Sequence, residues 1–224
     1  EQLVRSFRDR LPIAIHRPSI VVGDSRNGYT PHFKVLYWPL RLLSKEFIPF
    51  FATNTNAHLD VVPVDYVTDG IVALMGNKNT LGETFHLTAG MGREIKIREF
   101  LSDAYELMKV KRRPIIPFWL FRMIQHSFLA RLFHKSFWDA TRLAEPYLCY
   151  LKGTSVRFDN RKTSSILEAY GVHPPHWRAY RKEIMNYCIS SRWGKRLPLP
   201  EYVYYLPASR AAAQSPQLAA HSVG

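Results

Sequence analysis

Apolar and polar positions along the first 110 residues predict strands and helices in turn. Two short apolar runs, 11–16 and 19–22, are continuous rather than alternating, which predicts strands covered on both faces, as in a parallel sheet. A turn-rich loop follows over 23–28. Apolar residues at helical spacing predict a helix over 32–44, which Pro39 must start or kink. Further strands are expected at 47–51, 59–64 and 84–87, and further helices at 65–75 and 97–108.

This alternation of strand and helix indicates α/β architecture. We expect residues 1–110 to form one unit, and residues 111–200 to form a basic, aromatic and mainly helical segment. Within that second segment, helices are predicted at 163–170, stopped by Gly171, and at 177–189. Residues 201–224 are rich in Ala, Ser and Gln, which predicts a disordered tail.

Composition and charge refine this picture. The 224 residues are 46% hydrophobic and 13% aromatic, which excludes wholesale disorder. The formal net charge of +13 is uneven, because residues 1–106 hold 12 Lys/Arg and 12 Asp/Glu, whereas residues 107–200 hold 18 Lys/Arg and 5 Asp/Glu. The whole basic excess therefore belongs to the middle-to-late segment, and any argument from charge concerns that segment.

Compartment and completeness are inferred from a few features. The apolar runs fall short of the ~20 residues of a membrane helix, and the start lacks the pattern of a signal peptide. Two cysteines, Cys149 and Cys188, lack metal or redox spacing, which favours a reducing compartment and leaves one disulfide open. We expect a cytoplasmic protein. The pattern at Glu1 already has helical spacing without a cap, so we expect a fragment.

Three strings at a matching interval carry a resemblance to known enzymes. They are IAIHRPSIVVG at 13–23, LDVVPVDYVTDG at 59–70 and FHLT at 85–88. Together they resemble the C-terminal half of extended short-chain dehydrogenases of the epimerase/dehydratase type. They are most similar to the fatty acyl-CoA reductase and thioester reductase (male sterility) branch. The resemblance covers residues 1–110 well and is weaker over 158–187.

This resemblance implies a fold and a cofactor. The fold would be the C-terminal part of a Rossmann-like doubly wound sheet, together with a mainly helical substrate-side segment. The parent enzyme would use NADP or NAD. Pro18, Ser19, Ile20 and Val21 would lie against the nicotinamide, and Gly23 beside the substrate. The alternative for these residues is a core strand that ends in a turn.

Leu59 bears on the substrate. Nucleotide-sugar epimerases of this superfamily commonly carry at the corresponding position an Arg that binds the diphosphate. A leucine cannot make charge-assisted hydrogen bonds to phosphate. The resemblance therefore implies an apolar substrate at Leu59, such as an acyl thioester, a lipid or a sterol-like molecule, rather than a nucleotide sugar.

The Gly-rich turn and the catalytic Tyr and Lys of this family are not found in the sequence. These enzymes bind the dinucleotide diphosphate on a Gly-rich turn and use a Tyr general acid with a Lys one helical turn later. No Gly-x-x-Gly-x-x-Gly precedes a helix here. Tyr105 and Lys109 match the Tyr-x-x-x-Lys spacing, but an ordinary amphipathic helix explains them. We assign no catalytic residue and no metal site, and expect the chain alone to be inactive.

Asp65 and His16 could each have either a structural or a catalytic role. Asp65 is interpreted as the N-cap of the helix that follows it rather than as an acid catalyst. His16 is interpreted as a hydrogen-bonded core histidine rather than as a base.

The stretch 117–135 is the most distinctive part of the basic segment. Its apolar residues recur at helical spacing, and cations are interspersed among them: Phe121, Ile124, Phe128 and Leu132, with Arg122, Arg131 and Lys135. A core-facing helix with snorkelling cations is one reading. A lid over an apolar substrate and a surface that rests on anionic lipid are the others. No recognised motif supports a nucleic-acid partner.

Two functional hypotheses follow. The first is a fragment of an NAD(P)H-dependent oxidoreductase that acts on the carbonyl of an apolar small molecule. The second is a non-catalytic lipid- or membrane-surface module on a reductase scaffold, peripheral at an anionic membrane.

Overall fold

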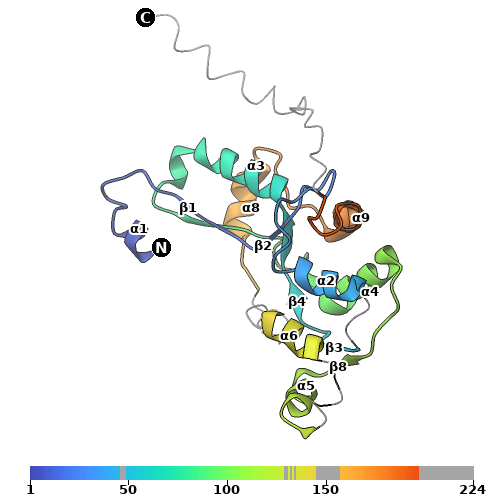
Figure 1. Ribbon diagram of the computed structural model, residues 1–224. Helices are drawn as coiled ribbons and strands as arrows, with labels where there is room; N and C mark the ends of the chain where they lie inside the picture. The colour runs from blue at the N-terminus through green and yellow to red at the C-terminus, as the bar shows by residue number, and fades with distance from the viewer. Residues whose placement is uncertain (46–48, 129–130, 132, 134, 145–156, 197–224) are drawn as a thin grey trace, which may run out of the picture.

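The computed structural model describes residues 1–45, 49–128, 131, 133, 135–144 and 157–196, in which strands and helices alternate over the first half of the chain (Figure 1). The strands are β1 (Ile15–Pro18), β2 (Ile20–Val22), β3 (Phe51–Ala52), β4 (His58–Leu59), β5 (Val61–Pro63), β6 (Thr84–Leu87), β7 (Ile95–Lys96) and β8 (Ile115–Ile116). The helices are α1 (Gln2–Arg5), α2 (Tyr37–Ser44), α3 (Val64–Met75), α4 (Ile97–Met108), α5 (Phe118–Gln125), α6 (Lys135–Ala144), α8 (Arg161–Glu168) and α9 (Trp177–Ser190), with a 3-10 turn at Lys78–Thr80. The predicted tail at 201–224 and the expected strand residues 47 and 48 lie outside the described residues.

Parallel strand pairs organise the first half of the chain. β1 pairs with β6, with Pro18 opposite Leu87, and β2 pairs with β5, with Val21 opposite Val62. The crossover from β5 to β6 contains α3, as parallel strands require. β3 and β8 are also parallel, whereas β4 and β7 are antiparallel. This arrangement confirms the predicted α/β architecture.

Asp60 divides the predicted strand 59–64 into two. Its buried carboxylate accepts hydrogen bonds from the backbone amides of Ala89, at 2.7 Å, and Gly90, at 3.4 Å. The chain therefore pairs with β7 before Asp60 and with β2 after it. A buried charge is tolerated here because backbone donors surround it.

Helix α9 completes the larger hydrophobic core. The Tyr180 hydroxyl donates to the Val61 carbonyl of β5 at 3.1 Å, and the indole nitrogen of Trp177 donates to Asp103 of α4 at 2.9 Å. The Arg181 guanidinium pairs with the same carboxylate. All but Arg181 are buried, so α9 is fixed to both β5 and α4 through groups that have left water. A smaller core lies beneath α3 and α8, with Val62, Leu74, Phe85, Leu87 and Leu167.

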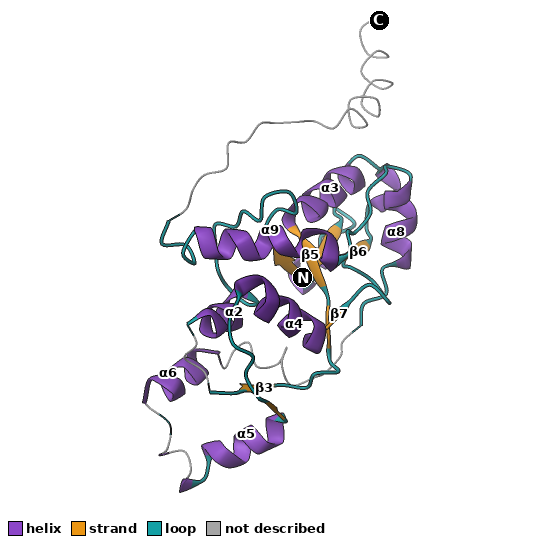
Figure 2. Cartoon of the chain, turned by 90° about the vertical axis from the view of Figure 1, so that its right-hand side faces the viewer, coloured by secondary structure: helices purple, strands orange, loops and turns teal. Residues whose placement is uncertain are grey.

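Helices α5 and α6 lie at the end of the molecule opposite α3 and α8 (Figures 1 and 2). They divide the single helical stretch that the sequence predicted. Phe121 is buried, which fits the core-facing reading, whereas Phe128 is 79% exposed, which fits a surface reading. Helix α5 ends at Gln125, which breaks the spacing before Phe128 is reached. Leu132 lies outside the described residues.

Within the described ranges, no helix combines the length and the apolar character needed to cross a bilayer.

Cys188 is fully buried in α9, and burial raises the pKa of its thiol to about 12. Cys149 lies outside the described residues.

Gly28 is where the loop after β2 touches α9. Its φ is +74°, and a Cβ there would lie 2.1 Å from the backbone carbonyl oxygen of Glu183. We predict that Gly28→Ala lowers the free energy of unfolding by about 3 kcal/mol, through a left-handed backbone cost and overpacking against α9. Gly82, with φ +79° and open space around it, is the matched control, for which Gly82→Ala should cost about 1 kcal/mol. Equal losses in urea unfolding of the two variants would contradict the contact.

Candidate functional site

Two exposed apolar residues, Pro18 and Val21, lie at the junction of β1 and β2. Pro18 is the last residue of β1, and Val21 is the second of the three residues of β2. Ligands of open α/β sheets bind outside the carboxyl ends of such parallel strands. Pro18 is exposed. Val21 is 38% exposed, although its neighbour Val22 and its strand partner Val62 are buried. The side chain of Val21 is therefore available to a ligand within a strand that is otherwise covered.

The backbone of this junction is fixed by its own hydrogen bonds. The Ser19 amide donates to the Leu87 carbonyl, and the Ile20 amide donates to the Asp60 carbonyl, both at 3.2 Å. Ile20 is half-buried and packs against the larger core. The Ser19 hydroxyl oxygen is buried and has no hydrogen-bond partner among the described residues. Because this oxygen is buried, it offers no surface to a ligand, and the accessible side chains at this junction are those of Pro18 and Val21.

The loop after β2 packs closely on itself. The Gly23 amide donates to the Tyr37 hydroxyl at 2.7 Å, and a Cβ at Gly23 would lie 2.3 Å from the Gly28 carbonyl oxygen. Burial raises the pKa of Tyr37, so its hydroxyl stays protonated at neutral pH. Gly23 is thus a position of close backbone approach, buried rather than open.

Asp65 fastens this loop to the start of α3. Its two carboxylate oxygens accept hydrogen bonds from the Ser25 backbone amide, at 2.9 Å, and from the Ser25 hydroxyl, at 2.6 Å. The predicted N-cap role of Asp65 is wrong, because the N-cap of α3 is Pro63 and Asp65 lies in the first turn. The carboxylate bonds donors across the chain rather than the amides of its own helix.

Two other predicted residues lie in covered positions. Leu59 is 3% exposed and belongs to the larger core, opposite Ile95 of β7. Burial lowers the pKa of His16, which favours its neutral form. The His16 Nδ1 atom has no hydrogen-bond partner among the described residues, so the predicted hydrogen bond is wrong for that nitrogen.

The Tyr105 and Lys109 spacing does not create a catalytic pair. Tyr105 is 7% exposed and packs in the larger core. Lys109 is exposed and follows α4 in a left-handed conformation, with φ +54°. A buried phenol and an exposed amine beyond the helix end do not face a common open site, which agrees with the rejection of this pair from the sequence.

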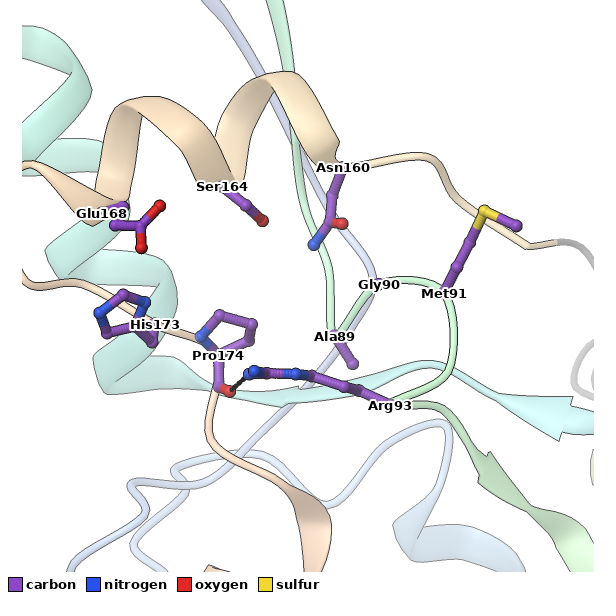
Figure 3. A pocket seen from close by; sticks show the side chains of 9 residues that line it. All are labelled: Ala89, Gly90, Met91, Arg93, Asn160, Ser164, Glu168, His173 and Pro174. Carbon is purple, nitrogen blue, oxygen red and sulfur yellow. Dashed lines mark hydrogen bonds between the residues drawn. The ribbon is translucent and has the colours of Figure 1, made fainter.

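A small polar pocket of about 250 Å³ lies between the loop after β6 and α8 (Figure 3). The loop is held by Asn160, which donates to the Thr88 carbonyl at 3.0 Å, and by Asp60. Arg93 lies along one wall and donates to the Pro174 carbonyl at 2.9 Å. The lining residues are Ala89, Gly90, Met91, Arg93, Asn160, Ser164, Glu168, His173 and Pro174.

The walls of this pocket do not suit an apolar ligand. A cation, Arg93, and an anion, Glu168, line it together with the amide of Asn160 and the hydroxyl of Ser164. Such groups can orient a small polar molecule but offer little surface to an alkyl chain. In the described ranges, no group of three or more His, Cys, Asp or Glu side chains could hold a metal ion. The open surface at Pro18 and Val21 is the better candidate for the functional site.

Sequence reasoning missed the residues that position this surface. Asp60 could have been identified from the sequence, because a charged residue within an apolar string needs a polar partner if it is buried. Ser25 could not have been identified in this way, because its partner Asp65 lies forty residues away in the sequence.

The sequence of this chain is similar to those of known proteins. Residues 1–71 match the family described as male sterility protein. Over 87 residues, the chain is 30% identical to a non-canonical nonribosomal peptide synthetase, hkm10, of Aspergillus hancockii, covering 39% of this chain and 8% of that protein. The family resemblance drawn from the sequence is thereby confirmed over residues 1–71.

Solved structures share the fold. The terminal R domain of the myxalamid PKS-NRPS biosynthetic pathway matches with a TM-score of 0.68 and 21% identity, covering 88% of this chain and 49% of that one. DesIV, a dTDP-glucose 4,6-dehydratase of Streptomyces venezuelae solved with NAD and TYD bound, matches with a TM-score of 0.55 and 14% identity, covering 85% and 48%. The chain therefore has a Rossmann-like fold and spans about half the length of these structures.

The Asp65 contact predicts a local effect on the loop. We expect Asp65→Ala to lower the free energy of unfolding by about 2 kcal/mol, because two hydrogen bonds to a charged group are lost. Ser25→Ala removes only the hydroxyl bond and should cost about 1 kcal/mol. Hydrogen exchange should accelerate at the Ser25 amide in Asp65→Ala. Faster exchange confined to the first turn of α3 would instead restore the N-cap interpretation.

Proposed function

We propose that this chain forms the substrate-side part of an NAD(P)H-dependent reductase that acts on the carbonyl of an apolar small molecule. The observation that carries the proposal is the exposed apolar pair in the parallel strand pairs β1–β6 and β2–β5: Pro18 is the last residue of β1, and Val21 is one residue from the end of β2. The carboxyl ends of parallel strands are where α/β sheets bind nucleotide cofactors.

The residues at this edge fit a nicotinamide ring. Pro18 and Val21 offer an apolar surface to one face of the ring. When bound, the reduced cofactor supplies a hydride. The chain's own part is to orient the ring through Pro18–Val21 and to hold the adjoining loop through Asp65 and Ser25.

The substrate class is argued from Leu59 and from the relatives. A buried leucine stands where nucleotide-sugar epimerases commonly carry an arginine for the diphosphate, so that cationic contact is absent. The relatives named as a peptide synthetase and as an R domain of a PKS-NRPS pathway support a substrate other than a nucleotide sugar. An acyl thioester, a lipid or a sterol-like carbonyl compound fits these observations.

The second hypothesis from the sequence, a non-catalytic lipid- or membrane-surface module, rests on other residues. Its support is the exposed apolar side chains and surplus of cations around α5, at the end of the molecule away from β1 and β2 (Figure 1). A surface there does not compete with a cofactor at Pro18–Val21, so the two properties are independent.

We predict that the 224-residue chain alone neither turns over nor binds NADPH tightly. The chain has no Gly-x-x-Gly-x-x-Gly ahead of a helix, and Tyr105 and Lys109, which have the catalytic spacing, do not face a common open site. Calorimetry should detect no NADPH affinity tighter than about 100 μM, since most of the dinucleotide contacts are missing. Micromolar binding would contradict this division of the site.

The activity itself is tested in the polypeptide extended by the coding sequence ahead of Glu1. NADPH oxidation at 340 nm should follow addition of a long-chain acyl-CoA. Val21→Asp should raise the KM for NADPH at least tenfold, because a carboxylate would replace an apolar contact and repel the cofactor phosphates. Val72→Asp, at a 59% exposed position of α3, is the matched control and should leave the KM unchanged. NADPH oxidation with a dTDP-4-keto sugar but not with the acyl-CoA would overturn the substrate class.

A further inference from the structure

Helix α5 is anchored to the rest of the chain by one side only. Phe121 is 4% exposed, and its ring lies 6.2 Å from that of Phe50 and 6.3 Å from that of Trp138. Phe137 is also buried, and its ring lies 5.5 Å from that of Phe50. Aromatic rings at these distances pack favourably. This cluster fixes one face of α5, so the opposite face is presented to solvent in a defined orientation.

The opposite face carries large apolar side chains in water. Trp119 is 63% exposed and Met123 is 61% exposed, and their spacing of four residues places them on one side of α5. Phe128, just beyond the helix, is 79% exposed, and Ile115, just before it, is 39% exposed. Scattered exposed apolar residues are common, but four within fourteen positions around one helix form a patch.

Cations surround this patch almost without anions. Residues 107–144 contain eight Lys/Arg and one acidic residue, Asp139. Arg122 lies on α5 between Trp119 and Met123 and is exposed, as are Lys111 and Arg112 ahead of the helix. The charge is therefore complementary to an anionic surface, and the apolar side chains stand among the cations rather than apart from them.

We infer that this face of α5 docks on an anionic lipid bilayer, with Trp119, Met123 and Phe128 entering the headgroup region. Helices with aromatic side chains and flanking Lys or Arg lie in membrane interfaces in this way. Eight residues at 1.5 Å per residue reach only about 12 Å, which is too short to cross the hydrocarbon core. The contact is therefore peripheral.

A lipid surface suits the patch better than a protein does. A stable protein interface needs about 800 Å² on each partner, with apolar anchors received in matching pockets. A single eight-residue helix at the end of the molecule offers a small, projecting surface (Figure 2). A bilayer needs no matching shape, because each apolar side chain that enters adds to the affinity independently.

The test uses the whole chain and vesicles of stated composition. The chain should sediment with vesicles of phosphatidylcholine and phosphatidylserine at a 7:3 ratio in about 0.1 M salt, and at least tenfold less with phosphatidylcholine alone. Raising the salt to about 0.5 M should weaken the binding, because the cations are screened. Equal binding to both vesicle types, or none to either, would overturn the inference.

Variants separate the patch from general stickiness. The double variant Trp119→Ala/Met123→Ala should bind the anionic vesicles at least tenfold more weakly, and Lys111→Glu/Arg112→Glu should do likewise. The matched control is Val72→Ala/Met75→Ala, which removes two side chains that are 59% and 75% exposed on α3, at the end of the molecule opposite α5 (Figure 1), and should bind as the parent does. Circular dichroism checks that each variant is folded.

Other occupants are outcomes of the same test. Capture by polyglutamate, but not by the anionic vesicles, would show that an acidic protein is the partner and overturn the lipid inference. Binding that survives Trp119→Ala/Met123→Ala would show that α5 is not the contact. Reductase activity of the extended polypeptide on a soluble substrate does not depend on this surface, so failure here leaves the proposed function to its own test.

Discussion

Strand β5 and the two aspartates beside it are the constraint on which the described architecture depends. Asp60, just before the strand, holds the loop after β6 through two backbone amides. Asp65, just after it, holds the loop after β2 through Ser25. Between them, the Val61 carbonyl receives the Tyr180 hydroxyl of α9. The six consecutive residues 60–65 thus connect the loop after β6, the loop after β2 and helix α9. Each connecting group is buried or half-buried, and losing a hydrogen bond costs the most free energy in such positions.

Regular elements were predictable where a single periodicity decided the outcome. The strand at 84–87 and the helix at 97–108 have the bounds that the pattern indicated, because their apolar residues face one core along their whole length. Predictions failed where a distant partner decided. Asp65 has the residue type and place of an N-cap, yet Ser25 offers its carboxylate two donors. For the stretch 117–135 the sequence left core-facing and surface readings open, and Phe128 is exposed because α5 ends three residues before it. Neither outcome could be derived from neighbouring residues in the sequence.

The candidate site was predictable in a different sense. Pro18–Val21 were indicated by a family string, and periodicity alone would have assigned them to a covered strand. The exposure of Pro18 and Val21 depends on which layers cover the sheet, and no local pattern contains that information. Leu59 illustrates the converse, because the same resemblance assigned it to the substrate, whereas its side chain lies in the larger core. A leucine at this position cannot make a charge-assisted contact with phosphate, whichever way its side chain points.

Glu94 and Arg157 mark how the basic segment joins the core. The segment leaves at the end of α4, and the chain is bound again at Arg157, whose guanidinium pairs with Glu94 just ahead of α4. Trp177 and Arg181 then close α9 onto α4 through Asp103. Glu94, just ahead of α4, and Asp103, within it, are thus bonded to chain that follows the excursion between α4 and Arg157, while β8 and Phe121 join the excursion itself to β3 and Phe50. Substitutions in the excursion that spare β8 and Phe121 would therefore leave the contact of α4 with α9 through Asp103 in place.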